Sequence, residues 1–115
     1  MDELYQISVE NGNLEPKQAV KYLRFIIASV RANNGRIVKV WHGNADTFSR
    51  GRLKEPIRAA LRKMKREGTI SFFICGEDFT EEDAASRYMI DRFPLSKEKD
   101  QDWGKRWDTY VMICL

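Results

Sequence analysis

The chain has 115 residues, of which 43% are hydrophobic and 32% are charged, and its formal net charge is +3. This length and composition suit one globular domain, so we expect a single domain over residues 1–115. No apolar run approaches the ~20 residues that cross a bilayer, so we expect no membrane-spanning segment and no membrane partner. Because the first residues are acidic and no secretory segment follows, we expect a cytoplasmic protein.

The cysteine and histidine content is low. Cys75 and Cys114 each lie in an apolar run, and His42 is the only histidine. In a reducing compartment such cysteines are typically free and buried. Their number and spacing match no zinc site, so we expect no metal and no other cofactor.

The first half of the chain predicts two strands and a helix. Apolar and polar residues alternate over residues 4–9, which favours a strand. Pro16 suits the first turn of a helix whose apolar residues recur at helical spacing until Asn33, Asn34 and Gly35 stop it. The β-branched and nearly continuous apolar run Ile37–Trp41 then predicts a strand in the sheet interior.

A second helix and a third strand follow. The helix presents one apolar ridge, begins near Arg52 because Pro56 must lie in or near its first turn, and ends at Gly68. The ridge consists of Leu53, Ile57, Leu61 and Met64. Residues 70–75 are apolar and predict the third strand.

The last part of the chain predicts one more helix and one more strand. Thr80 and Asp83 resemble a capping box at the start of a third helix, which Pro94 ends. Residues 95–108 are polar and turn-like apart from two tryptophans, and residues 109–115 predict a buried strand.

These elements alternate as β-α-β-α-β-α-β, which indicates the α/β class. Short connections favour right-handed crossovers, so we expect a mainly parallel four-stranded sheet with helices packed on it. The long segment before the last strand leaves the direction of that strand open.

The positive charge of the chain is concentrated in one segment. Residues 50–66 hold eight Lys or Arg side chains against one acid, Glu55, for a local charge of +7. A ridge of cations spaced four apart follows from helical periodicity and consists of Lys54, Arg58, Arg62 and Arg66. A solvated helix face usually intersperses acids, so this pattern favours binding of a polyanion.

His42 and Gly43 end the second strand, at the edge where α/β sheets bind ligands. We expect the imidazole to point at the loop surface, where it is a candidate general acid or base, or a phosphate contact. The alternative is a histidine that only hydrogen-bonds the loop. Gly43 and Gly51 bracket a loop whose amides precede a helix, which also suits phosphate.

Acidic residues gather after the third strand, at Glu77, Asp78, Glu81, Glu82 and Asp83. Acids at this place stabilise the start of a helix, which is our main interpretation. A divalent-metal site and a surface for a basic partner or a second copy are the alternatives.

The segment Ile37–Gly43 resembles the second strand and His-Gly of the small MutS-related (Smr) domain. Gly51-Arg52-Leu53-Lys54 resembles the start of the helix that follows in that family, and Gly12 and Ala19 resemble its first turn and helix. The chain departs from the family where Ile7-Ser8-Val9-Glu10 replaces Leu-Asp-x-His and Ala45 replaces a glycine. The resemblance implies an Smr-like fold, nucleic-acid binding and, in some members, endonuclease activity.

We therefore expect a domain that binds DNA or RNA. The candidate binding residues are Arg50, Arg52, Lys54, Arg58, Arg62, Arg66, His42 and Gly43. We assign no catalytic residue, with His42 the only candidate. The sequence leaves cleavage undecided and favours its absence; an enzyme on this chain would be endonuclease-like. The alternative is a protein-binding or inhibitory module whose basic helix and acidic loop contact a protein partner or a second subunit, which exposed Trp103 and Trp107 would favour.

Overall fold

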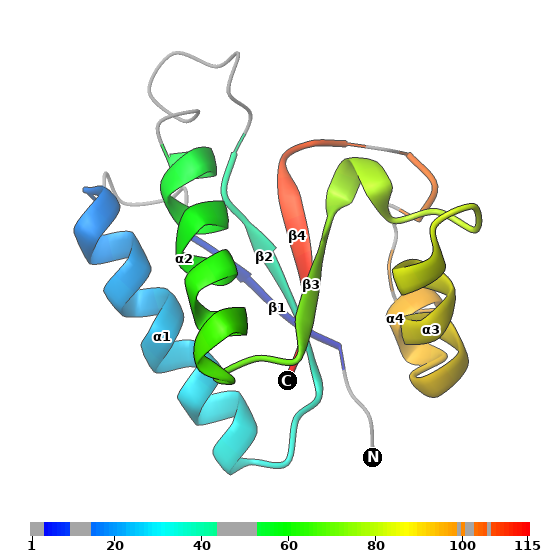
Figure 1. The fold of residues 1–115 in the computed structure, drawn as a ribbon, viewed down its shortest axis with the longest axis horizontal. Coiled ribbons are helices and arrows are strands. Elements are labelled where there is room, and N and C mark those ends of the chain that lie inside the picture. The colour runs from blue at the N-terminus through cyan, green and yellow to red at the C-terminus, as the bar shows by residue number, and fades with distance from the viewer. Residues whose placement is uncertain (1–3, 10–14, 44–52, 99, 101–102, 106) are drawn as a thin grey trace.

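The computed structural model describes residues 4–9, 15–43, 53–98, 100, 103–105 and 107–115. Its elements in chain order are β1 (Leu4–Ser8), α1 (Pro16–Ala32), β2 (Ile37–Trp41), α2 (Lys54–Glu67), β3 (Phe72–Cys75), a short 3-10 helix (Gly76–Asp78), α3 (Ala84–Arg92), α4 (Leu95–Glu98) and β4 (Tyr110–Cys114) (Figure 1). The predicted α/β class is confirmed, and α4 is an addition within a segment expected to be turn-like.

The four strands form one mixed sheet in the order β1-β2-β4-β3. The pair β1–β2 is parallel, whereas β4 runs antiparallel to both β2 and β3. The expectation of a mainly parallel sheet is therefore wrong. The long connection from β3 through α3 and α4 brings the chain back to the end of the sheet where β2 and β3 terminate (Figure 1). Strand β4 begins there and so runs in the direction opposite to β2 and β3.

The composition of β4 explains its central place. All five residues of Tyr110–Cys114 are buried, and the strand lies between β2 and β3. A strand that is apolar on both faces loses most of its contact with water when it has a neighbour on each side and packing above and below. Burial of this strand thus favours an inner position over an edge.

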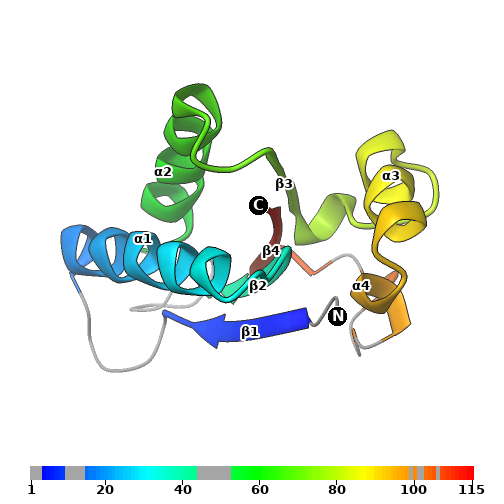
Figure 2. The ribbon, with the colours of Figure 1, turned by 90° about the horizontal axis from the view of Figure 1, so that it is seen from below.

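Helices pack on both faces of the sheet. On one face α1 and α2 contribute Leu23, Ile27, Ile57 and Leu61 to a core that includes alternate residues of the strands. On the other face Phe79, Met89 and Phe93 cover Ile74 and Met112. Figure 2 shows α1 and α2 on one side of the sheet, with α3 and α4 displaced toward β3.

Local sequence signals set the helix ends. Asn34 has a φ of 63° just after α1, and Gly68 has a φ of 81° at the end of α2, both left-handed. The start of α3 differs from expectation, because its N-cap is Asp83 and not Thr80. The Asp83 carboxylate accepts a hydrogen bond of 2.8 Å from the Ser86 amide, as N-cap residues do.

The interior position predicted for β2 is confirmed by its pairing with β1 and β4. This burial includes Lys39, which is 1% exposed. The Lys39 ammonium lies 2.5 Å from an Asp100 oxygen and 4.4 Å from the ring centroids of both Trp41 and Tyr110. Ion pairing and two aromatic faces compensate for lost hydration, so Lys39 anchors the segment after α4 to the sheet.

In the described part of the chain, no helix has both the length and the apolar character that a bilayer crossing requires.

Candidate functional site

His42 lies at the carboxyl end of β2 and is fully buried. Its Nδ1–H donates to the Gly43 carbonyl at 2.8 Å, and its Nε2 accepts from the Arg58 Nε–H at 3.2 Å. Burial lowers the pKa of His42 from 6.5 to about 4, assisted by the charges of Arg58 and Lys54. The neutral ring therefore has both nitrogens occupied at physiological pH.

The expectation that this imidazole points at the loop surface is wrong. Gly43 is buried too, and its amide donates to the Thr109 carbonyl at 3.1 Å. Neither residue offers an exposed group to a phosphate, and His42 is not placed to exchange a proton with a bound molecule. This geometry agrees with the alternative prediction, in which His42 only forms hydrogen bonds within the chain.

Arg58 forms the centre of the same site. Only 7% of the residue is exposed. Its guanidinium donates two hydrogen bonds, of 2.9 and 2.8 Å, to the two carboxylate oxygens of Glu77, and a third of 3.3 Å to the Asp108 carbonyl. This fork-to-fork geometry is the strongest form of an arginine–carboxylate pair.

The pKa shifts of Arg58, Glu77 and Asp108 reflect the ion pairs of this site. Burial alone would raise the pKa of Glu77, but the hydrogen bonds and charge of Arg58 outweigh burial and lower it. Burial alone would lower the pKa of Arg58, but its hydrogen bond to Glu77 raises it. Lys54 lies 2.8 Å from an Asp108 carboxylate oxygen, and this hydrogen bond lowers the pKa of Asp108.

We call His42, Lys54, Arg58, Glu77 and Asp108 the Arg58 cluster. It ties together the end of β2, the start of α2, the segment after β3 and the segment before β4. This place, beyond the carboxyl ends of β2 and β3, is where the sequence predicts a ligand site. The structure fills it with ion pairs internal to the chain, so Lys54 and Arg58 have partners before any ligand arrives.

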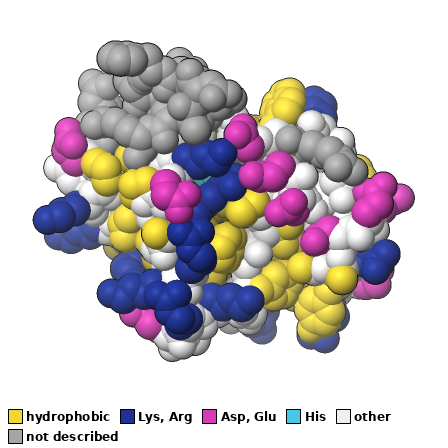
Figure 3. Space-filling model, turned by 45° about the horizontal axis from the view of Figure 1, so that its top comes forward, with side chains coloured by type: hydrophobic (Ala, Val, Ile, Leu, Met, Phe, Trp, Pro, Cys, Tyr) yellow, Lys and Arg dark blue, Asp and Glu magenta, His cyan; other side chains and the backbone are white. Residues whose placement is uncertain are grey.

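The cations further along α2 have a different environment. Arg62, Lys63, Lys65 and Arg66 are all exposed. Arg62 pairs with Glu55 at 2.5 Å, but both side chains are open to water, and such pairs contribute little. Figure 3 shows a band of Lys and Arg side chains on this face of the molecule, with hydrophobic side chains beside it.

The structure thus divides the predicted cationic ridge. Lys54 and Arg58 belong to the Arg58 cluster, whereas Arg62 and Arg66 are exposed. The candidates Arg50 and Arg52 lie outside the described residues.

The acidic residues after β3 are largely engaged within the chain. Glu77 binds Arg58, Asp83 caps α3, and Glu81 lies 3.3 Å from the Lys97 ammonium. Among the described residues, no group of three or more His, Cys, Asp or Glu side chains is arranged to hold a metal ion. Capping, the main interpretation, holds for Asp83.

The two tryptophans of residues 95–108 differ. Trp103 is half-buried and packs edge-on against Phe79 with ring centroids 4.7 Å apart. Trp107 is 46% exposed, and the Lys105 ammonium lies 4.8 Å from its ring centroid.

Sequence reasoning missed a groove between β3 and α3. Arg36, Tyr88 and Arg92 line it together with the adjacent residues Phe72 and Phe73. Two signals mark it in the sequence: the adjacent phenylalanines, and the spacing of four between Tyr88 and Arg92, which places them on one helix face. Neither signal indicates which strand lies at the sheet edge.

The chain matches no protein-family model, and comparisons with curated proteins and with solved structures find no significant similarity.

Proposed function

We propose that this domain binds nucleic acid through the exposed cations on the C-terminal half of α2. The observation that carries the proposal is the group Arg62, Lys63, Lys65 and Arg66, which lies exposed within two helical turns. Within the part of the chain that the structure describes, Lys63, Lys65 and Arg66 form no ion pair. Cations without internal partners are those that gain most from contact with phosphates.

This proposal moves the binding surface relative to the sequence-based candidates. Lys54 and Arg58 neutralise Asp108 and Glu77, so a phosphate would have to compete with carboxylates already at 2.8 Å. Arg62 and Arg66 stay in the binding surface, and Lys63 and Lys65 join them. His42 and Gly43 act only indirectly, by fixing the position of Arg58.

No cleavage is proposed. A general acid or base must reach the proton that it transfers, and the His42 ring is buried with both nitrogens occupied. Phosphate contacts also position a nucleic acid without reading its bases, so the surface on α2 supports binding that depends little on sequence.

The test is the salt dependence of binding to short duplex DNA, single-stranded DNA and RNA, measured by fluorescence anisotropy. Three or four phosphate contacts give a log–log slope of about −3 to −4 on duplex DNA. In the double variant Lys65→Glu/Arg66→Glu we expect much weaker binding. The magnitude of the log–log slope should fall by about 2, because each phosphate contact that is lost removes the release of about one counterion.

The matched control is Lys17→Glu/Lys21→Glu, which makes the same charge change at two exposed positions of α1. It should keep the slope of the natural chain. Absence of binding at low salt, or an equal loss in the control, would contradict the proposal.

A protein partner is the second candidate function. Tyr22 and Phe25 lie three residues apart on α1 and are 41% and 65% exposed, and exposed aromatic side chains are common at protein interfaces. A natural chain that binds no nucleic acid but forms a dimer in sedimentation analysis would favour this candidate.

A further inference from the structure

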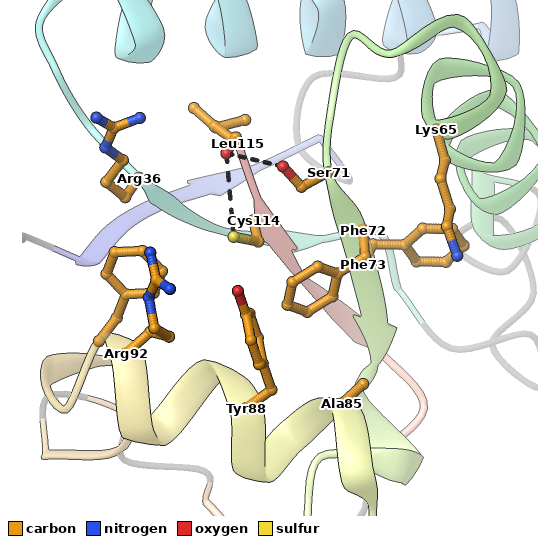
Figure 4. A pocket seen from close by; sticks show the side chains of 11 residues that line it. Arg36, Lys65, Ser71, Phe72, Phe73, Ala85, Tyr88, Arg92, Cys114 and Leu115 are labelled. Atoms are coloured by element: carbon orange, nitrogen blue, oxygen red, sulfur yellow. Dashed lines mark hydrogen bonds between the residues drawn. The ribbon is translucent and has the colours of Figure 1, made fainter.

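The groove found between β3 and α3 has a volume of about 590 Å³, within the usual range of ligand pockets. Figure 4 shows Tyr88 pointing from α3 toward the strands, with Arg92 on one side and the phenylalanines of β3 on the other. Tyr88 is 50% exposed, and its ring centroid lies 5.8 Å from that of Phe72. An open aromatic surface therefore forms one wall of this groove.

The position of β3 explains why the groove exists. Among the described strands β3 is the last in the sheet order and pairs only with β4, so its outer edge has no strand beside it. A second hollow continues along this edge toward Cys75 and shares Lys65, Phe73 and Ala85 with the first. The hollows follow the length of β3 between α2 and α3, and Lys65 joins them to the cations of α2.

Charge distinguishes the two hollows. The first is lined by Arg36, Lys65 and Arg92, and by no acidic side chain of the described residues. The second, beside Arg62 and Arg66, also contains Asp78 and Asp83. An anionic ligand with flat apolar groups fits the first hollow best, because cations and aromatic rings meet there without a carboxylate side chain.

We propose that the groove beside Tyr88 binds the bases of single-stranded nucleic acid while its phosphates lie on Arg36, Lys65 and Arg92. This inference rests on the proposed function and specifies the class of nucleic acid. Bases in a duplex are stacked inside the helix, whereas bases of a single strand are free to stack on aromatic rings and guanidinium groups. Arg92 lies 5.7 Å from the Tyr88 ring centroid and adds a second planar group of this kind.

The test compares the affinity of single-stranded and duplex oligonucleotides at low salt for the natural chain, Tyr88→Ala and Tyr88→Phe. We expect the natural chain to prefer single strands. Tyr88→Ala should weaken single-strand binding about tenfold, as loss of one stacking contact does, and should leave duplex binding unchanged. Tyr88→Phe should retain single-strand binding, because the ring remains.

Tyr22→Ala on α1 is the matched control. That tyrosine is also exposed but does not line the groove, so its loss should leave single-strand binding unchanged. Equal affinity for duplex and single strand, or an unchanged affinity in Tyr88→Ala, would overturn the inference while leaving the proposed function intact. Absence of all nucleic-acid binding would overturn both. A synthetic glutamate-rich peptide whose binding depends on Tyr88, where oligonucleotide binding does not, would also overturn the inference and favour an acidic strand added to the edge of β3.

Discussion

The two halves of α2 carry the same kind of side chain in different environments. In the N-terminal half, Lys54 and Arg58 face acids at the ends of other elements and form ion pairs of 2.8 Å. In the C-terminal half, Lys65 and Arg66 face water beside the edge of β3. The first pair of cations stabilises the fold, and the second pair is available to a ligand.

The comparison teaches that helical spacing alone does not identify a binding surface. Arg58 and Arg62 are four residues apart and belong to the same predicted ridge. Arg58 is buried because α2 begins at the carboxyl edge of the sheet, where Glu77 follows β3. Arg62, one turn further on, lies beyond that edge and remains exposed.

The largest expected effect is on stability, and it contrasts these two arginines. Arg58→Ala would leave Glu77 without its bidentate partner and the His42 Nε2 without a donor. Arg58 is buried and Glu77 is half-buried, so removing the guanidinium leaves both Glu77 and the His42 Nε2 without their hydrogen-bond partner, and we expect the free energy of unfolding to fall by about 3 kcal/mol. Arg62→Ala should change it by less than about 0.5 kcal/mol, because its ion pair is exposed.

Urea denaturation of both variants measures this difference. Equal losses in Arg58→Ala and Arg62→Ala would remove the distinction between the two halves of α2.

The second effect is the dependence of stability on pH. The pKa of His42 is about 4 in the folded chain and 6.5 as the ordinary value, so the unfolded chain binds the proton more tightly. The stability that the neutral His42 ring contributes is therefore fully present above pH ~6.5 and is lost as pH falls toward 4. Linkage gives a loss of about 2 kcal/mol between pH 7 and pH 5 from this group alone.

Denaturation of the natural chain and of His42→Gln at both pH values checks this contribution. The variant should lose much less stability across the interval, since glutamine does not titrate. An identical pH dependence in the two chains would show that His42 is not buried in its neutral form.

The smallest effect concerns the reactivity of the two cysteines. Burial raises the pKa of both thiols, Cys75 at the end of β3 near the Arg58 cluster and Cys114 in the wall of the groove. Both thiols are free. We expect slow reaction of both with a thiol reagent at neutral pH, and slower reaction of Cys114, which is buried, than of Cys75, which is half-buried.

Labelling kinetics followed by peptide mass spectrometry measures the two rates. Rapid stoichiometric labelling of Cys114 without denaturant would show that the groove wall opens.

The sequence by itself determined the four strands, the three longer helices and several of their ends. Proline at the first turn of α1, Asn34 after it and Gly68 after α2 act through backbone geometry that involves only neighbouring residues. The nearly continuous apolar run of β2 likewise required burial on both faces, whatever its neighbours. Such signals are local, and this is why they could be predicted.

The tertiary structure alone decided the place of β4, the burial of Arg58 and the groove beside Tyr88. The position of β4 between β2 and β3 depends on pairing between residues far apart in the chain, and the long connection before it permits either direction. Arg58 is 19 residues from Glu77, and no periodicity indicates that they meet. The groove follows from β3 lying at an edge, because open edges and ion pairs arise only when distant elements come together.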